Sequence, residues 1–421
     1  MKRKNKLQLK LTTQQIDPGV KKTLSLKGKN GSRKSAFTLE TSEALLQSNV
    51  QIQPNQIDSV SILERWIIDV GAKTPKPPFT KDTSLTHKDF KLNSDKLSAS
   101  GAFGTVWLCK HKEFPDLPLA MKIIPCKLNS NGPSGRELLE IKREIQINRL
   151  LEHQHIVAWY GSTVDLDNGV SILMEYVDGP TLDNAILLGG RFPMDISEYC
   201  LKSIIEALNY MKTEHKVAHR DIKPTNIMFN AKGILKLCDF GCSRIISTTQ
   251  KSHASALVGA KSYMSPEMLN FDDRDDMDYY QSDVFSLSTT LLECLFGFYP
   301  YPLVEDQSLK NFLDANRPTT DRNKESSGGY ITRDLSENTI FGIMTILDEL
   351  QGSRFPDFIL NDEEEVYFKK SYVDIIDRMT IKNPKERINY EQMFENEYFQ
   401  SITFEQSDIQ AWVAQVLSFA E

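Results

Sequence analysis

Cysteine is scarce in this sequence, and so are long apolar runs. The 421 residues include only six cysteines, scattered without the paired spacing that binds a metal ion. A chain of this length buries a large core and has no need of disulfides, so we expect free thiols. No apolar run approaches the roughly 18 residues of a membrane-spanning helix. The basic start is not followed by the apolar stretch of a signal peptide, so we expect a cytoplasmic protein with no membrane span, for which nuclear entry stays open.

Acidic residues are nearly absent from the first part of the chain. Residues 1–34 hold eleven lysines and arginines but a single acid, Asp17, although the whole chain has a formal charge of −7. Residues 1–56 also show no sustained hydrophobic periodicity, which predicts a mobile basic and polar tail. Residues 57–86 follow as a predicted amphipathic helix over Ile57–Val70 and a proline-containing linker.

The rest of the chain divides into a β-rich part and a helical part. Strand patterns over Thr105–Lys110 and Leu119–Pro125 precede a helix pattern over Arg136–Leu151. The patterns are mainly helical after residue 179. The predicted helices and short strands of this part are Ile196–Lys212, Asp283–Gly297, Tyr372–Met379 and pieces around Ile227 and Leu235. The polar stretch 304–338 predicts an inserted loop, and residues 400–421 predict a C-terminal helical segment.

A glycine-rich turn between strands is able to close over phosphate groups. Absent or small side chains let backbone N–H groups approach a phosphate. The residues expected to cover a nucleotide in this way are Ser98, Ala99, Ser100, Gly101, Ala102, Phe103, Gly104 and Val106. On its own the pattern is more typical of a plain hairpin, because Ala99 stands where the G-x-G-x-x-G pattern has its first glycine.

Lys122 lies in the next strand pattern among apolar neighbours. An ammonium group in such a place is costly unless a phosphate or a carboxylate meets it. The following helix offers Glu144 on its inward, apolar face, whereas Glu137 and Glu140 fall where we expect solvated surface charges. We therefore expect Lys122 to pair with Glu144.

Two motifs further along the chain carry the chemistry. Residues His219–Asn226 match H-R-D-x-K-x-x-N, and Asp239–Gly241 is D-F-G. Phosphoryl transfer depends mostly on positioning. This set supplies a carboxylate for the incoming hydroxyl, a cation for the γ-phosphate and two oxygen ligands for magnesium.

These motifs resemble the protein kinase family over roughly Phe90–Phe399. The resemblance implies a bilobal α+β fold for a domain over 87–399, with a β-rich N-lobe over about 87–175 and a larger helical C-lobe over about 179–399. It also implies ATP and Mg²⁺ as cofactors. By the same resemblance, Asp221 is the catalytic base and Lys223 contacts the transferred phosphate. Asn226 and Asp239 are the implied magnesium ligands. Lys122, paired with Glu144, is implied to position the α- and β-phosphates.

The resemblance also implies where the adenine ring binds. Met174 resembles the gatekeeper, and the backbone of Glu175 and Val177 is expected to bind the adenine edge in an apolar slot. Ala120 is expected among the nucleotide-binding residues. Cys238, next to the D-F-G motif, is either a small buried core residue, which we favour, or a thiol that a ligand reaches.

Three further matches predict structural roles. Glu267, in Ser265-Pro266-Glu267, is expected to pair with Arg387, and Asp283 is expected to open the large-lobe helix.

Within the kinase family, several segments resemble the MAP kinase kinases. Lys223 is typical of serine/threonine and dual-specificity kinases, and Val258–Glu267 carries tyrosine-methionine before its last triplet, as MAP kinase kinases do. This resemblance implies phosphorylation of the threonine and tyrosine of a MAP kinase activation loop.

The two ends of the chain resemble partner-binding segments of the same family. Lys2–Leu9 resembles a MAP kinase docking peptide, although a nuclear-import signal, a polyanion-binding arm or a solvated tail has the same composition; we expect no nucleic acid partner. Phe404–Val413 resembles a docking segment for an upstream MAP kinase kinase kinase, or it is a helix that caps the large lobe.

The loop after the D-F-G motif resembles the segment in which this family carries a two-site phosphorylation switch. Ser252 stands at the first expected site, but Ala256 occupies the second, with Ser255 beside it. We expect Ser252 and Ser255 to form a shifted pair, with Thr248 and Thr249 as further candidates. The alternative is that these hydroxyls only keep the loop solvated.

Other interpretations stay open. The helix over Ile57–Val70 either restrains the kinase or stabilises its small lobe, which we favour. A kinase of another tier, such as a MAP kinase kinase kinase, shares the catalytic motifs. Two residues suggest a scaffold-type pseudokinase: Ala99 replaces a glycine, and Ser288 stands where the large-lobe helix commonly has glycine. The intact catalytic set argues against this interpretation.

Overall fold

The computed structural model describes residues 22–24, 37–39, 79, 85, 87–101, 104–125, 135–165, 169–246, 259–269, 277–297, 299 and 369–420. The chain forms two units, Met1–Ile57 and Asp58–Glu421. In the first unit, β1 (Lys22–Leu24) pairs antiparallel with β2 (Phe37–Leu39), within the segment predicted as a mobile tail. The predicted helix over Ile57–Val70, the insert 304–338, and Ser252 and Ser255 lie outside the described residues.

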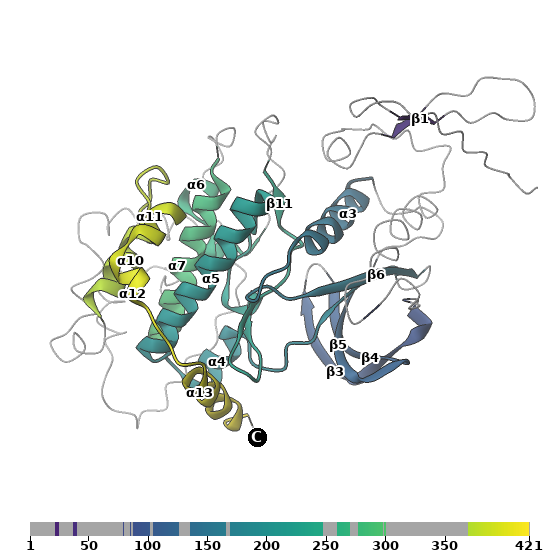
Figure 1. Ribbon diagram of the computed structural model, residues 1–421, viewed down its shortest axis with the longest axis horizontal. Helices are drawn as coiled ribbons and strands as arrows, with labels where there is room; N and C mark the ends of the chain where they lie inside the picture. The colour runs from purple at the N-terminus through teal and green to yellow at the C-terminus, as the bar shows by residue number, and fades with distance from the viewer. Residues whose placement is uncertain are drawn as a thin grey trace, which may run out of the picture. The chain divides into compact units, whose positions relative to one another are not determined.

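The small lobe of the second unit is built on a five-stranded antiparallel sheet with the strand order β3-β4-β5-β7-β6. Its strands are β3 (Phe90–Gly101), β4 (Gly104–His111), β5 (Phe114–Ile124), β6 (Trp159–Asp165) and β7 (Gly169–Glu175). Helix α3 (Gly135–Leu150) packs on the sheet through Ile141 and Ile145, which bury against Trp159 and Ile172. Figure 1 shows this sheet and α3 on one side of the unit.

The two strands and the helix predicted for this lobe are confirmed, but β5 begins five residues earlier than predicted. Its first part contains Pro115 and Pro118, which the sequence pattern counts against a strand. The register shifts between Cys109 and His111, the partners of Leu119 and Phe114, so both prolines lie in an irregular stretch of the β4–β5 ladder. There a missing N–H donor leaves no regular ladder bond unmade.

The large lobe is mainly helical, as predicted. Its longer helices are α4 (Leu182–Gly189), α5 (Met194–His215), α7 (Tyr279–Phe296), α10 (Lys370–Thr380) and α13 (Gln406–Ser418). Shorter elements are β8 (Val217–Ala218), η3 (Pro224–Asn226), β9 (Ile227–Phe229), β10 (Leu235–Leu237), β11 (Arg244–Ile245), η4 (Lys261–Tyr263), α6 (Pro266–Leu269), α11 (Tyr390–Glu395) and α12 (Glu397–Ser401). One large core of buried apolar side chains joins α5, α7 and α10.

Helix α7 runs through the centre of this lobe and begins earlier than predicted. The side chain of Asp278 accepts hydrogen bonds from the backbone N–H groups of Tyr280 and Gln281, and so caps the helix. The prediction that Asp283 opens the helix is therefore wrong: Asp283 lies one turn inside it and is buried. Ser288 is also buried, and its hydroxyl donates to the Phe285 carbonyl at 2.7 Å.

The predicted pair between Arg387 and Glu267 is confirmed. The two side chains form a bidentate ion pair with N···O distances of 2.7 and 2.9 Å. The pair joins α6 to the turn that precedes α11.

Helix α13 covers the large lobe at its end. The Trp412 ring packs edge-on against Phe192 and Phe229, with ring centroids 4.7 and 5.5 Å apart, and Ile409 and Val413 are buried beside them. The apolar face of the C-terminal segment is thus occupied by its own lobe, as the capping interpretation predicts. Among the helices that the structure describes, none is both long and apolar enough to cross a bilayer.

Candidate active site

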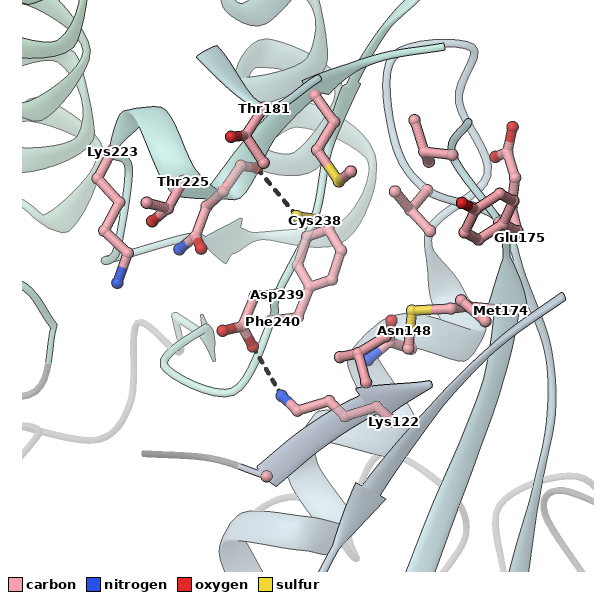
Figure 2. Close-up of a pocket in the computed structure, with 18 of the residues that line it drawn as sticks. Lys122, Asn148, Met174, Glu175, Thr181, Lys223, Thr225, Cys238, Asp239 and Phe240 are labelled. Atoms are coloured by element: carbon pink, nitrogen blue, oxygen red, sulfur yellow. Dashed lines mark hydrogen bonds and ion pairs between the residues drawn. The ribbon is translucent and has the colours of Figure 1, made fainter. Parts of the chain in front are cut away.

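A cavity of about 500 Å³ lies where the sheet meets the helical lobe (Figure 2). Its lining combines apolar side chains with polar and charged ones, which is the mixture that a ligand site needs. The lining residues from the sheet, α3 and the connection between the lobes are Gly104, Val106, Ala120, Lys122, Glu144, Asn148, Val157, Met174, Glu175, Tyr176 and Val177. Those from the helical lobe are Thr181, Asp183, Asn184, Lys223, Thr225, Asn226, Met228, Cys238, Asp239 and Phe240.

The glycine-rich turn ends at the rim of this cavity. Residues Ser98 to Gly101 belong to β3, whose Gly101 pairs with Gly104 of β4, while Ala102 and Phe103 lie outside the described residues. A Cβ atom on Gly104 would lie 2.3 Å from the Ile123 carbonyl oxygen, and the φ angle of Gly104 is +124°. Glycine is therefore required at this position. Gly104 and Val106, two of the residues expected to cover a nucleotide, line the cavity.

Lys122 is brought between two carboxylates that are distant in sequence. Its Nζ atom lies 2.7 Å from Glu144 Oε1 and 2.7 Å from Asp239 Oδ1 (Figure 2 shows the second contact). Burial disfavours the ammonium, but the two carboxylates outweigh this effect and raise the pKa of Lys122. The amine therefore stays charged at neutral pH.

Helix α3 presents Glu144 because its apolar side faces the sheet. Ile141 and Ile145 bury on either side of Glu144, and the Glu144 side chain is itself only 6% exposed. Glu137 and Glu140 are exposed, so the choice of Glu144 as the partner of Lys122 is confirmed. Burial raises the pKa of the Glu144 carboxyl, and the nearby Lys122 ammonium opposes this shift.

The segment His219–Asn226 forms a tight polar cluster between β8 and β9. Asp221 Oδ2 accepts hydrogen bonds from Lys223 Nζ at 2.7 Å and from Asn226 Nδ2 at 2.9 Å. Asn226 Nδ2 also donates to the Asp221 carbonyl at 2.8 Å. Lys223 and Asn226 thus both lie within hydrogen-bond distance of Asp221.

Asp283 fixes the start of this segment from helix α7. Its two carboxylate oxygens accept the backbone N–H groups of His219 and Arg220, each at 2.7 Å. Arg220 has a φ angle of +70°, a strained conformation for a non-glycine residue that needs such support. Asp283 therefore acts on the site by holding backbone, not by opening a helix.

Asp239 sits opposite, at the end of the strand that follows. Its φ angle is +63°, and its Oδ1 atom accepts the Gly241 N–H at 3.3 Å as well as Lys122 Nζ. Burial alone raises the pKa of the Asp239 carboxyl, but the Lys122 ammonium outweighs burial and lowers the pKa below its usual value. An ionised carboxylate therefore faces the cavity together with the Asn226 amide.

The connection between the lobes lines the far end of the cavity. Met174, Glu175 and Val177 are all part of the lining, as predicted. The Glu175 N–H already donates to the Ala158 carbonyl at 2.8 Å, so this N–H is engaged within the protein. The Glu175 carboxylate pairs with Lys236 at 3.0 Å and so fixes the connection to the large lobe.

The preferred interpretation of Cys238 as a core residue needs correction. The residue is half-buried and lines the cavity, and its Sγ atom donates to the Asn226 carbonyl at 3.2 Å (Figure 2). Burial raises the pKa of the thiol to about 12, so the group stays protonated. The five cysteines that the structure describes are all free thiols.

Sequence reasoning missed the lining residues at the start of α4 and on α3. Thr181 caps α4 by accepting the Asn184 N–H at 3.0 Å, which brings Asp183 and Asn184 to the cavity. The threonine before an apolar run was a usable helix-start signal. Asn148 follows Glu144 by four residues, so it lies on the same helix face.

Comparisons with known proteins agree with this geometry. Residues 94–399 match the family described as "Protein kinase domain". The chain is 30% identical over 319 residues to the dual specificity mitogen-activated protein kinase kinase dSOR1 of Drosophila melanogaster. That alignment covers 76% of this chain and 73% of the relative.

Proposed function

The chain belongs to the protein kinase family and is similar to the MAP kinase kinases, and from that premise we propose that it transfers the γ-phosphoryl group of ATP to the threonine and tyrosine of a MAP kinase activation loop. One observation carries the transfer chemistry: Lys122 Nζ bridges Glu144 and Asp239 at 2.7 Å to each. A pure scaffold has no need of this buried charged arrangement. The substrate class is supported by the similarity to dSOR1 and by the tyrosine-methionine pattern before Ser265.

The cavity fits ATP and Mg²⁺ by its chemistry. Its apolar slot suits an adenine ring between Ala120 and Met228, and Lys122 offers a cation to the α- and β-phosphates. Asp239 and Asn226 present oxygen ligands, which Mg²⁺ prefers, and the ion when bound neutralises charge on the phosphates.

The residues of the His219–Asn226 segment would act on the incoming hydroxyl. Asp221 would orient it and accept its proton, while Lys223, 2.7 Å away, would meet the charge on the transferred phosphoryl group. Asn226 holds Asp221 in place through two hydrogen bonds.

A cluster of three arginines supports activation by phosphorylation. Arg143, Arg220 and Arg244 come from α3, the His219–Asn226 segment and β11, and they repel one another: burial together with Arg220 and Arg143 lowers the pKa of Arg244 to about 10. Among the described residues, the buried Nε atoms of Arg220 and Arg244 have no hydrogen-bond partner. A phosphate on Ser252 or Ser255, in the loop that follows Arg244, would supply the missing negative charge.

Partner binding rests on the two ends of the chain. The basic peptide Lys2–Leu9 would meet an acidic patch and an apolar groove on the substrate MAP kinase. The apolar face of α13 packs on the lobe. An upstream MAP kinase kinase kinase that binds the C-terminal segment would therefore have to use exposed residues such as Phe419, which directly follows α13 and is 57% exposed.

The test is mass spectrometry of catalytically dead MAP kinases after incubation with ATP, magnesium and this chain, which an active upstream kinase has treated first. We expect phosphate on both the threonine and the tyrosine of a Thr-x-Tyr loop, and none with Asp221→Asn. Phosphate only on generic serine or threonine peptides would assign the chain to another kinase tier. No transfer and no ATP binding would indicate a scaffold. Ser252→Ala combined with Ser255→Ala should abolish activation, and unchanged activation would refute the shifted pair.

A further inference from the structure

The carboxylate of Asp221 is nearly enclosed in this structure. Its side chain is only 2% exposed, and it is not part of the cavity lining. Lys223 and Asn226 both donate to Oδ2, whereas Oδ1 accepts the backbone N–H of Ala260 at 2.8 Å. A carboxylate has about four acceptor positions, so the described donors fill both positions on Oδ2 and one on Oδ1. A hydroxyl group that hands its proton to Asp221 therefore has to meet Oδ1, next to the Ala260 amide.

The Ala260 amide reaches Asp221 because the preceding residue is glycine. Gly259 has a φ angle of +112°, and a Cβ atom there would lie 2.6 Å from the Arg220 carbonyl oxygen and 3.2 Å from Asp221 Oδ1. The backbone of Gly259 thus packs directly on the Arg220–Asp221 peptide. No other residue adopts this conformation without strain or a clash.

The other side of the same turn is held by helix α7. The Ala260 carbonyl accepts the Tyr263 N–H at 3.0 Å, and the buried Tyr263 side chain donates to Glu293 at 2.5 Å. Tyr299 donates to the Ser262 carbonyl. The turn that carries the Ala260 N–H is therefore also held by contacts that do not involve Asp221.

We propose that the backbone N–H of Ala260 positions the catalytic base, holding Oδ1 of Asp221 so that its remaining acceptor position faces the substrate hydroxyl. Alanine has no side-chain donor, so this role belongs to the backbone alone. The geometry of the base then depends on how residues 259–263 seat against α7. The inference rests on the proposed role of Asp221 and adds a group that no sequence motif indicates.

Asp221 Oδ1 is the proton acceptor in the proposed transfer step. The hydroxyl oxygen forms a bond to the γ-phosphorus, and the bond from that phosphorus to the bridging oxygen of ATP breaks, with its electron pair leaving on ADP. The hydroxyl proton passes to Asp221 Oδ1. The Ala260 N–H remains bound to Oδ1 throughout and keeps the carboxylate from rotating away.

The test compares Ala260→Pro, which lacks the N–H, with Ala260→Val, which keeps it and adds no side-chain donor. Both are made in the full chain, activated by the upstream kinase and assayed on the same dead MAP kinase. We expect kcat of the proline variant to lie about 10- to 150-fold below that of the valine variant, the rate equivalent of losing one hydrogen bond to a charged group. KM for ATP should agree within about twofold, because Ala260 lies outside the cavity lining.

Gly259→Ala provides a second route that keeps the amide but displaces it. Its methyl group would push the turn away from the Arg220 carbonyl, so kcat should again fall while KM for ATP stays unchanged. Equal kcat values for Ala260→Pro and Ala260→Val, or a rise in kcat with proline, would overturn the inference; the rise would mean that the amide blocks the base. If the proline variant does not fold, unchanged kcat in Gly259→Ala overturns it. If the unsubstituted chain transfers no phosphate, this would instead overturn the proposed function, and the inference with it.

Discussion

Replacing Arg387 by lysine should destabilise the large lobe severely, although the charge is kept. All five N–H donors of Arg387 are used: two bind Glu267, and the others bind the carbonyl oxygens of Ile381, Gln281 and Lys382 at 2.8, 2.6 and 3.1 Å. The side chain is completely buried, and its guanidinium lies over the Phe285 ring at 5.1 Å. Lysine has three donors and no planar fork, so at least two acceptors lose their partner.

The magnitude follows from the acceptors left unpaired. Each buried acceptor without a donor costs about 1–3 kcal/mol, so Arg387→Lys should lower the free energy of unfolding by roughly 3 kcal/mol. Arg387→Met removes the charge that Glu267 faces and should cost about 3–5 kcal/mol. Arg387→Met combined with Glu267→Met should cost less than Arg387→Met alone, because no buried charge is left unpaired.

The assay is urea unfolding followed by tryptophan fluorescence. Glu391→Gln is the matched control, because it breaks an ion pair with Lys212 in which the Glu391 side chain is 59% exposed, and it should change the free energy of unfolding by no more than about 1 kcal/mol. A cost below about 1 kcal/mol for Arg387→Lys would refute the donor count. A double variant as unstable as Arg387→Met would refute the argument from the unpaired charge.

Three further predictions concern the cavity and the lobe connection. Lys122→Met leaves the Glu144 and Asp239 carboxylates facing each other, so phosphoryl transfer should fall by roughly 100-fold or more in steady-state assays, and a loss below tenfold would contradict the assigned role. Burial lowers the pKa of His155 to about 4, so the neutral ring contributes stability that is fully present above pH 6.5. The free energy of unfolding, measured with urea, should fall by up to about 3 kcal/mol as the pH drops from 6.5 to 4. His155→Gln should make this pH dependence weaker. Burial raises the pKa of Cys238 to about 12, so iodoacetamide should modify it far more slowly at pH 7.5 than a free cysteine, with ATP slowing it further; rapid labelling in peptide maps would show a thiolate.

Sequence patterns predicted a contact correctly where the chemistry of a residue allows only one partner. Lys122 among apolar neighbours needed a carboxylate, and the helix face left only Glu144 to provide it. The two motifs predicted Asp221, Lys223, Asn226 and Asp239 as residues of one site, but they did not predict the distances between these side chains. Those depend on backbone supports such as Asp283, whose acceptor role is set by the packing of α7 under the segment.

The predictions that were wrong or absent have local causes. The expectation that Asp283 opens the helix followed from a match to the family pattern. Asp278 is a good N-cap residue, and its cap makes α7 begin at Tyr279. The prolines in β5 hid its first half. The hydrogen bond from Ala260 to Asp221 could not be predicted from side chains at all, because the donor is backbone and its direction depends on a positive φ angle at Gly259.

The packing of α13 bears on where this domain physically ends. The family match stops at residue 399, yet Ile402, Ile409, Val413 and Val416 are each at most 3% exposed. Trp412 covers Phe192 and Phe229, and the backbone N–H of Gln410 lies against Gly233 in the turn between β9 and β10. A chain shortened to the family boundary would uncover this apolar surface next to the β9–β10 hairpin, which directly follows Asn226, and we expect it to aggregate more readily than the full chain. Expression work on this kinase should keep the residues through 418 and place any tag beyond them.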